Sequence, residues 1–154
     1  MDTMTDSAAT SGTRRVDQLL AHYGESHRNP TNGVIHCFAI PLIMVSLVGL
    51  MYALHPWVAY LFLAASMVYY LRIGSWVFVA TMAVISVLAV AIVQALGSWL
   101  LPVSIAVFVL AWIAQFIGHR IEGKKPSFFE DLQYLWVGPL FVLAKLFGKL
   151  GLRY

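Results

Sequence analysis

The sequence contains few charged residues. Asp, Glu, Lys and Arg make up 11% of its 154 residues, whereas hydrophobic residues make up 60%. A soluble domain usually carries about 25% charged and about 45–50% apolar residues. The shortage of charge therefore excludes an ordinary soluble domain and places the chain among membrane proteins. The net charge of +3 is small and its residues adjoin apolar runs, so we attribute it to membrane topology and expect no nucleic-acid partner.

Cysteine is nearly absent as well. Cys37 is the single one, so no disulfide can form within the chain. It lies beside His36, but a small buried apolar role is more typical of such a residue than metal ligation. The sequence lacks the metal and redox motifs HExxH and CxxC. Residues 1–13 also lack the basic and apolar regions of a signal peptide, so we expect a disordered tail there and a single membrane domain over residues 14–154.

Polar stretches are missing from the middle of the chain, where four apolar runs follow one another. These runs cover residues 34–54, 57–71, 75–96 and 99–117. A helix needs about 20 residues to cross the hydrocarbon core of a bilayer. Pro41 lies inside the first run and predicts a kink, which membrane helices tolerate. We therefore predict an all-α integral membrane bundle of four transmembrane helices.

Shorter elements are expected on both sides of this bundle. Residues 14–23 carry apolar side chains at helical spacing, which predicts an N-terminal amphipathic helix. Asn32 is predicted to cap the first long helix. Near the other end, Ser127 followed by Glu130 resembles a capping box. The uncharged residues 132–144 that follow are too few to span, so we predict a C-terminal interfacial or re-entrant helix.

The basic residues favour four spans over five. With four spans, both termini and the loop after the second helix share one side, and all ten Lys and Arg residues lie on it. A fifth span would move Lys145, Lys149 and Arg153 to the other side. Because basic loops tend to stay in the cytoplasm, we predict that both termini are cytoplasmic. The membrane would be the inner membrane of a bacterium or the endoplasmic reticulum of a eukaryote.

This threading gathers histidines at one membrane face. His36 begins the first predicted span and His119 ends the fourth. His27 precedes His36 by nine residues, which would place the two on opposite faces of one straight helix, but the Asn29-Pro30 turn lets the rings converge. Three neutral imidazoles suit a first-row transition metal such as Fe(II) or Zn(II). A histidine at a helix end can also simply meet water, and for each one alone that interpretation stays open.

Four other residues lie near these histidines in the sequence. Glu122 follows the third histidine by three residues, and is a candidate catalytic residue, metal ligand, acceptor for a ligand, or surface charge. Asn32 and Gln115 each precede a histidine by four residues, and are candidates to support the ligands. Tyr23 precedes the first histidine by four residues, and is a candidate hydrogen-bond donor in catalysis or a packing residue.

Basic residues border the predicted metal site. Arg28, Arg120 and Lys124 lie close to its histidines in the sequence. They either anchor the chain to anionic lipid or bind an anionic headgroup such as a fatty-acid carboxylate. We interpret His22 as a surface residue and His55 as a turn residue at the far face.

Two motifs in these stretches resemble the Mpo1-like family. The first, YGESHRNPTNGVIH at residues 23–36, contains Tyr-x3-His-x4-Asn-x3-His. The second, QFIGHRIEGKKP at residues 115–126, contains Phe-x-Gly-His-x2-Glu-x3-Pro. GPLFVLAK follows at residues 138–145, and the resemblance covers about residues 16–153.

The resemblance implies an Fe(II)-dependent dioxygenase that uses O₂ to shorten long-chain 2-hydroxy fatty acids by one carbon, as in α-oxidation. It implies that His27, His36 and His119 hold the iron, and that Glu122 binds the iron or orients a ligand. The substrate carboxylate and 2-hydroxyl are expected at the metal, with the acyl chain between the spans or in the bilayer. The resemblance assigns no ligand role to His22.

Two other classes of function compete with this one. A non-catalytic lipid-binding or structural membrane protein could carry the same histidines at its helix ends. A small transporter is disfavoured, because the middles of the spans lack the ionisable residues that usually mark an ion path. Bound iron would discriminate the enzyme from the lipid-binding protein. The oligomeric state stays open.

Overall fold

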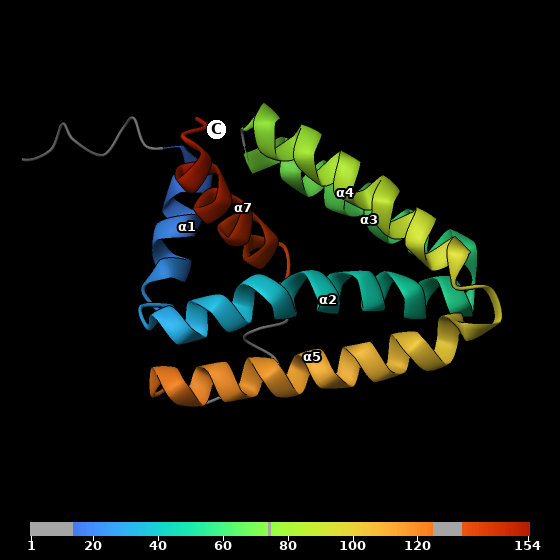
Figure 1. Ribbon diagram of the computed structural model, residues 1–154. Helices are drawn as coiled ribbons and strands as arrows, with labels where there is room; N and C mark the ends of the chain where they lie inside the picture. Colours follow the sequence, from blue (N-terminus) through green and yellow to red (C-terminus); the bar gives the residue numbers. More distant parts are fainter. Residues whose placement is uncertain (1–13, 74, 125–133) are drawn as a thin grey trace, which may run out of the picture.

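The computed structural model describes residues 14–73, 75–124 and 134–154. These residues form helices and no strand (Figure 1), so the all-α prediction is confirmed. In chain order the helices are α1 (Arg15–Gly24), α2 (Pro30–Leu54), α3 (Pro56–Ile73), α4 (Trp76–Ala95), the short 3₁₀ helix η1 (Gly97–Trp99), α5 (Leu100–Glu122) and α7 (Val137–Leu150). The tail predicted at residues 1–13 and the capping box predicted at Ser127 and Glu130 lie outside the described residues. That residues 14–154 form one domain stays a prediction.

Four stretches are long and apolar enough to cross a membrane, which makes this an integral membrane protein. They are α2, α3, α4 and the continuous segment Gly97–Glu122, of 25, 18, 20 and 26 residues. α2 and α5 extend beyond the apolar runs that predicted them, into the polar stretches that carry the histidines. α7 has 14 residues, fewer than the about 20 that a span needs. Four spans flanked by two shorter helices are therefore confirmed.

The start of α2 differs from its prediction. Oδ1 of Asn29 accepts hydrogen bonds from the backbone N–H groups of Thr31 at 2.9 Å and Asn32 at 3.4 Å, so Asn29 is the N-cap. Pro30 occupies the first helical position, where a missing N–H leaves no hydrogen bond unmade. The predicted cap at Asn32 is wrong, because the Asn-Pro pair is the stronger start signal. Asn32 instead lies inside the helix and is buried.

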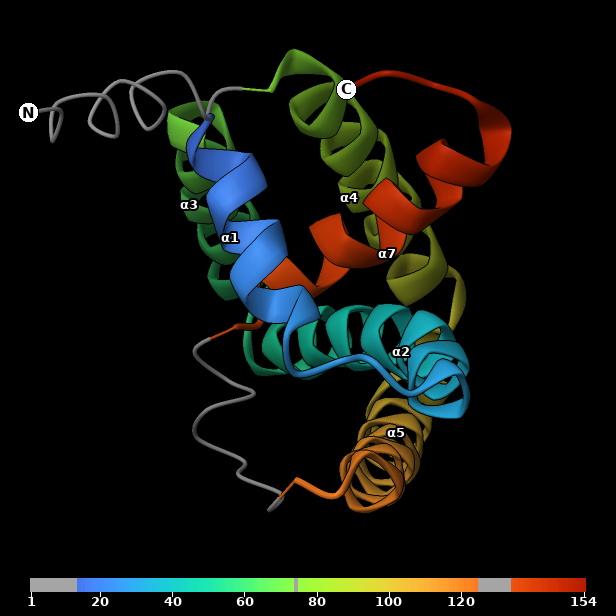
Figure 2. The ribbon, with the colours of Figure 1, turned by 90° about the vertical axis from the view of Figure 1, so that its left-hand side faces the viewer.

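The long helices form a V made of two antiparallel pairs (Figure 1). α2 lies along α5, and α3 lies along α4. The pairs meet where α2 turns into α3 and where α4 leads through η1 into α5, which we call the turn end. The histidine end is the opposite end, where α2 begins and α5 finishes. α1 and α7 lie there, in the open mouth of the V (Figure 2).

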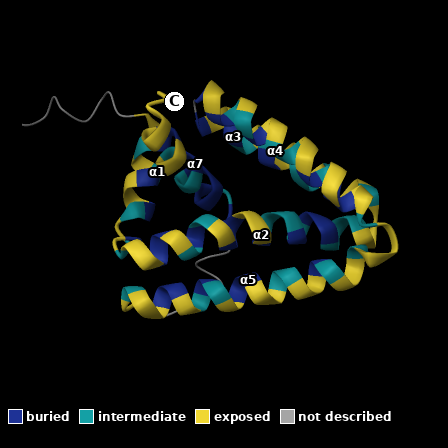
Figure 3. Cartoon of the chain, viewed as in Figure 1, coloured by how far each residue is buried: buried dark blue, intermediate teal, exposed yellow. Residues whose placement is uncertain are grey.

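Apolar side chains fill the mouth of the V. The buried cluster joins α1 and α7 to the near ends of α3 and α4, and consists of Val16, Leu20, Tyr70, Ile73, Phe78, Met82, Leu140, Leu143 and Phe147. The outward faces of the long helices are apolar and exposed (Figure 3), as at Leu88 and Leu110, which are 56% and 65% exposed. Such an apolar exterior is expected for helices surrounded by lipid.

Basic residues gather around the mouth. Those in the described part of the chain belong to α1, the turn before α2, the end of α3, the end of α5 and the C-terminal part that begins with α7; they are Arg14, Arg15, Arg28, Arg72, Arg120, Lys124, Lys145, Lys149 and Arg153. The connections at the turn end, residue 55 and residues 96–99, carry no charged side chain. This is the one-sided distribution that four spans require. Which compartment the mouth faces stays a prediction.

Close packing of α2 on α5 depends on two glycines. A Cβ on Gly49 would collide with the hydroxyl group of Ser104, and a Cβ on Gly118 would collide with Oδ1 of Asn32. Small residues let membrane helices approach each other, and van der Waals packing then holds them together. The approach at Gly118 brings the beginning of α2 against the end of α5, where two of the histidines lie.

Candidate metal centre

Three histidines meet at the histidine end. His27 lies in the turn after α1, His36 near the start of α2, and His119 in the last turn of α5. Their ring centroids are 4.4 Å apart for His27–His36, 5.1 Å for His36–His119 and 5.8 Å for His27–His119. One ring nitrogen from each lies within 4.8 Å of the other two. The predicted convergence of the three rings is present, and metal binding by them stays a prediction.

The rings are withdrawn from water. His27, His36 and His119 are 8%, 1% and 7% exposed. A short turn places the first of them, because the backbone N–H of His27 donates to the carbonyl of Gly24 at 3.0 Å as the chain leaves α1. Buried polar groups need hydrogen bonds or a metal ion to compensate for lost hydration.

Hydrogen bonds to the backbone fix two of the rings. Nδ1 of His27 lies 2.7 Å from the carbonyl oxygen of Tyr23, and Nδ1 of His36 lies 2.9 Å from that of Asn32. A carbonyl oxygen only accepts, so both Nδ1 atoms carry the proton and both Nε2 atoms keep a lone pair. Nε2 of His36 is buried and has no hydrogen-bond partner within the described residues. An unmade bond of this kind costs about 1–3 kcal/mol, which a metal ion bound by the lone pair would remove.

The three rings fit a resident transition-metal ion. Two nitrogens bound to one ion at about 2.1 Å are at most about 4.2 Å apart, so a spread of up to 4.8 Å is close to what a shared ion needs. Metal-binding histidines usually donate their other N–H to a carbonyl or carboxylate, as His27 and His36 do. Imidazole ligands suit zinc, copper, iron and nickel. The donor set therefore supports a metal of this group without selecting iron.

Glu122 holds the turn that carries the first histidine. Its carboxylate accepts hydrogen bonds from the backbone N–H groups of Arg28 at 2.8 Å and Asn29 at 2.9 and 3.1 Å. The side-chain amide of Asn32 donates to it as well, at 2.9 Å. Both carboxylate oxygens are thus engaged, and the group of three candidate ligands does not include Glu122. The geometry favours a positioning role, and the ligand role stays a prediction.

Asn32 connects this carboxylate to a histidine. Its side chain donates to Glu122, and its backbone carbonyl accepts from His36. The residue is completely buried and packs where Gly118 leaves space on α5. The helical spacing in the sequence pointed to a contact between Asn32 and His36, but the backbone makes that contact rather than the side chain.

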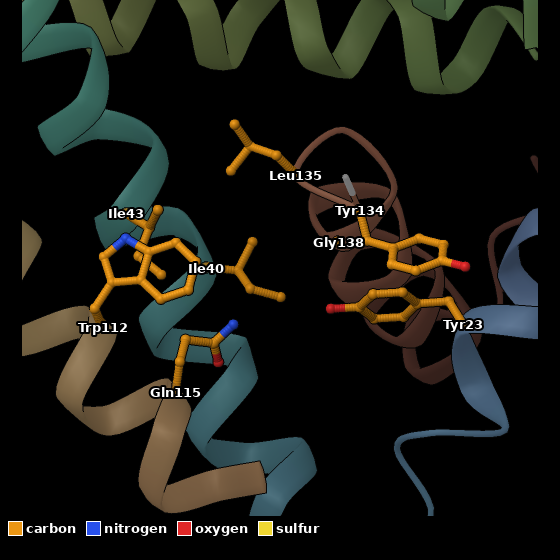
Figure 4. A pocket seen from close by; sticks show the side chains of 8 residues that line it. All are labelled: Tyr23, Ile40, Ile43, Trp112, Gln115, Tyr134, Leu135 and Gly138. Atoms are coloured by element: carbon orange, nitrogen blue, oxygen red, sulfur yellow. The ribbon is translucent and has the colours of Figure 1, made fainter. Parts of the chain in front are cut away.

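A small pocket adjoins the histidines (Figure 4). It lies between α1, α2, α5 and the segment that leads into α7, where about 300 Å³ is free of protein atoms and part of this space is open to the outside. The ring of Tyr23 stacks on that of His27 with centroids 4.1 Å apart and 14° between the planes. The Tyr23 hydroxyl and the Gln115 amide both point into the pocket (Figure 4). Oε1 of Gln115 is buried and has no hydrogen-bond partner in the described part of the chain.

Comparison with known families adds an independent finding. A sequence profile of the family described as 2-hydroxy-palmitic acid dioxygenase Mpo1-like matches residues 13–150. The chain belongs to the Mpo1-like family. The match covers every described helix, from α1 to α7. Searches among curated proteins and among solved structures found no match.

The basic residues that the sequence placed around the site of this Mpo1-like protein lie at the histidine end, in the turn before α2 and at the end of α5. Arg28 and Arg120 are exposed. Nζ of Lys124 donates to the hydroxyl of Ser26 at 3.0 Å, in the turn before α2. A role of these cations in binding a headgroup stays a prediction.

Lys145 is a cation near the histidines that the sequence did not single out for the site. Its Nζ lies 4.6 Å from the ring centroid of Phe141, and that ring lies 5.6 Å from the ring of His27. A Cβ on Gly33 would be 2.9 Å from the same Nζ. None of the described carboxylates forms an ion pair with Lys145. Helical spacing puts Gly138, Phe141 and Lys145 on one face of α7, but spacing alone does not tell what that face meets.

The remaining histidines and the cysteine lie outside the group. Nε2 of His22 is 3.0 Å from the hydroxyl of Tyr134, and the residue is exposed. His55 lies at the turn end, where its ring accepts a hydrogen bond from the backbone of Trp57 at 3.3 Å. Cys37 is half-buried and is not one of the grouped ligands.

Proposed function

We propose that the protein is a non-haem Fe(II)-dependent dioxygenase that acts on long-chain 2-hydroxy fatty acids and releases the acid one carbon shorter. The observation that carries this proposal is the buried group of His27, His36 and His119, whose ring nitrogens lie together. The family description supports the substrate class and the use of O₂. The four membrane helices are consistent with a lipid-soluble substrate.

The overall reaction balances without an external reductant. One 2-hydroxy acid and one O₂ give the shortened acid, carbon dioxide and water. The bond between C1 and C2 breaks, and the carbon that carried the hydroxyl group becomes the new carboxyl carbon. Iron held by three imidazoles would have open coordination positions. It would provide the reactivity towards O₂ that amino-acid side chains lack.

Groups of the chain itself would bind and orient the substrate. The ammonium group of Lys145 lies near the histidines and is proposed to hold the substrate carboxylate through a charge-assisted hydrogen bond. The hydroxyl of Tyr23 and the amide of Gln115 point into the adjoining pocket and are proposed to bind the 2-hydroxyl group. Fixing both polar groups of the substrate would orient the bond between C1 and C2 relative to the metal.

Glu122 and Asn32 are proposed to act through the histidines. By holding the backbone of the turn, the carboxylate fixes where His27 lies relative to α2 and α5. Asn32 fixes the ring of His36 through its carbonyl. Partners of this kind set the orientation and basicity of metal ligands, and their loss typically costs about 10–100-fold in metal affinity or activity.

The position of the site suits an amphiphilic substrate. The metal centre lies at one end of the membrane helices, so a polar head can remain near water while the acyl chain stays in an apolar environment. We propose that this end faces the cytoplasm, because the basic residues gather around it. Arg28, Arg120 and Lys124, exposed at this end, would attract an anionic headgroup.

Anaerobic reconstitution tests the proposed function. The purified protein is loaded with Fe(II), its metal content is measured, and O₂ and 2-hydroxypalmitate are then added. We expect about one iron per chain and, by mass spectrometry, the acid with one carbon fewer. Protein loaded with Zn(II) is the matched control, because the same imidazoles bind zinc but zinc has no redox chemistry. An iron-loaded protein that binds the acid without shortening it would contradict the proposal and favour a lipid-binding role.

A further inference from the structure

A second cavity lies deeper in the V than the pocket beside the histidines. It lies between α2, α3, α4 and α7, where about 580 Å³ is free of protein atoms and part of this space is open to the outside. Its walls are apolar side chains such as Met44, Val48, Ala89 and Leu143. The hydroxyl of Ser86, a polar group in the wall, already donates to the carbonyl of Met82 at 2.7 Å. The cavity therefore suits hydrocarbon and offers little to a polar ligand.

Neighbouring residues on two helices line the pocket and the cavity. On α2, Ile40 lines the pocket and Pro41 lines the cavity; on α7, Gly138 lines the pocket and Pro139 lines the cavity. Gly138 has no side chain, and a Cβ there would lie 3.1 Å from Cδ1 of Ile40. The buried side chain of Ile40 thus packs against Gly138 where α2 meets α7, next to residues that line the cavity, and an acyl chain that reached from the pocket into the cavity would pass this contact.

α7 has two chemically different faces. Phe141 and Lys145 point toward the histidines and the start of α2. Pro139, Val142 and Leu143 line the apolar cavity. The helix therefore combines a cation on one side with a hydrocarbon wall on the other, which is the polarity of a fatty acid.

Counted from the histidines, the depth along α2 matches the length of one acyl chain. From His36 to Val48, α2 rises by about 18 Å at 1.5 Å per residue. One leaflet of a bilayer, filled by single acyl chains, is about 15 Å deep, half of the about 30 Å hydrocarbon core. Beyond this depth Val48, Ala59 and Val93 form a closed buried cluster, which gives the cavity a floor.

We propose that this cavity holds the acyl chain of the substrate and that its floor sets the longest chain the enzyme accepts. The proposal rests on the proposed function, since it gives the acyl chain of that substrate its place. The chain extends from the metal centre past Ile40 and along α2 towards Val48. The competing occupant, the acyl tail of a bilayer phospholipid, is separated by the experiments that follow.

Filling the cavity is the first test. Ala89 is buried in its wall, so Ala89→Phe shortens the space for the chain. In an apolar pocket, each methylene group that no longer fits lowers kcat/KM about tenfold or more. For Ala89→Phe, kcat/KM for the longest 2-hydroxy acids should therefore fall more than tenfold, while kcat/KM for the shortest acids should not change. Leu88→Phe is the matched control, one residue away but 56% exposed on the outer face. An unchanged chain-length profile for Ala89→Phe, with iron still bound, would overturn the proposal.

Two further experiments, which enlarge the cavity and label it, do not depend on whether Ala89→Phe folds. Met44→Ala should shift the optimum towards longer acids, which an overall loss of stability would not do. A 2-hydroxy fatty acid with a photoreactive diazirine at its chain end should label residues of α2, α4 and α7 that line the cavity, in the presence of excess phospholipid. Labelling of outward residues such as Leu88, or equal labelling of the cavity by a diazirine phospholipid, would sink the proposal.

The labelling also separates this proposal from the function on which it rests. If the acid labels the cavity but wild-type protein with bound iron produces no shortened acid, the proposed reaction fails and the binding site stands. If wild-type protein shortens the acid but the label appears on the outer faces, the reaction stands and the binding site fails.

Discussion

The two helix pairs bury different kinds of side chain. In the α2–α5 pair the buried residues include many polar ones: Asn32, His36, Ser46, Ser104, Gln115 and His119. In the α3–α4 pair the buried residues in the described part of the two helices are apolar apart from Ser66 and Tyr70, whose hydroxyl groups donate to backbone carbonyls. Both pairs are apolar on the outside, so lipid exposure does not explain the contrast.

The contrast separates two tasks. Polar side chains inside membrane proteins are costly and usually functional, so the α2–α5 pair is where chemistry is expected. The α3–α4 pair instead diverges from α2 towards the mouth and supplies the apolar wall of the larger cavity. The α2–α5 pair is packed closely through glycines, which brings His36 and His119 together, and the α3–α4 pair lines the apolar cavity.

The largest effect is expected from His36→Ala, in the polar pair. The change removes one of three candidate ligands, so bound iron should fall from about one per chain to below detection, together with turnover. Metal analysis of the purified variant measures the loss, and His22→Ala is the matched control because that exposed ring lies outside the group. If His36→Ala kept its metal, the buried polar residues of the α2–α5 pair would not be the metal site.

Glu122→Gln should have the next largest effect. The amide keeps the shape of the side chain but weakens the hydrogen bonds to the N–H groups of Arg28 and Asn29, so metal affinity should fall about 10–100-fold. X-ray absorption should show the same nitrogen ligands as in wild type. Glu25→Gln, at an exposed carboxylate near His22, should change nothing. A lost oxygen ligand in the spectrum would instead establish Glu122 as a metal ligand.

Gly118→Ala tests the close packing of the polar pair. The added Cβ meets the side chain of Asn32, and overpacking of this kind typically costs about 1–3 kcal/mol of unfolding free energy. Unfolding in detergent micelles measures the change. In Gly148→Ala, on α7, the new Cβ has nothing within 4 Å, so that variant should match or exceed wild type. Equal stability of the two variants would show that the packing of α2 on α5 does not need the space that Gly118 leaves for Asn32.

The smallest effect is expected from Lys145→Met. The methionine keeps an apolar stem but loses the charge, and because Lys145 is an exposed residue, the loss should be about 1 kcal/mol, or about fivefold in KM. The effect on KM should exceed the effect on kcat, since an exposed cation would contribute mainly to binding the carboxylate and only partly to orienting it. Lys149→Met on the same helix is the control. An equal rise in KM in both variants would show that Lys145 only attracts the anion through its charge, as any cation on α7 would, and does not bind the carboxylate directly.

Local sequence patterns predicted most of the architecture and part of the site. The apolar runs predicted the spans, and the placement of His36 and His119 at span ends predicted that they would meet. The N-cap was misplaced at Asn32 because two cap signals lie three residues apart, and the Pro30 that follows Asn29 decided between them. The partners of Glu122 were not predicted, because they are backbone N–H groups more than ninety residues earlier in the chain.

The sequence by itself determined how many helices cross the membrane, which end carries the charge and which histidines share a face. These properties follow from the length and hydropathy of the apolar runs, and both quantities depend only on consecutive residues of the chain. Only the tertiary structure decided that Glu122 holds the turn before α2, that Lys145 reaches Gly33, and that an apolar cavity opens between α4 and α7. Those outcomes depend on how α5 and α7 pack against α2, and the spacing of residues within one helix carries no information about a second helix.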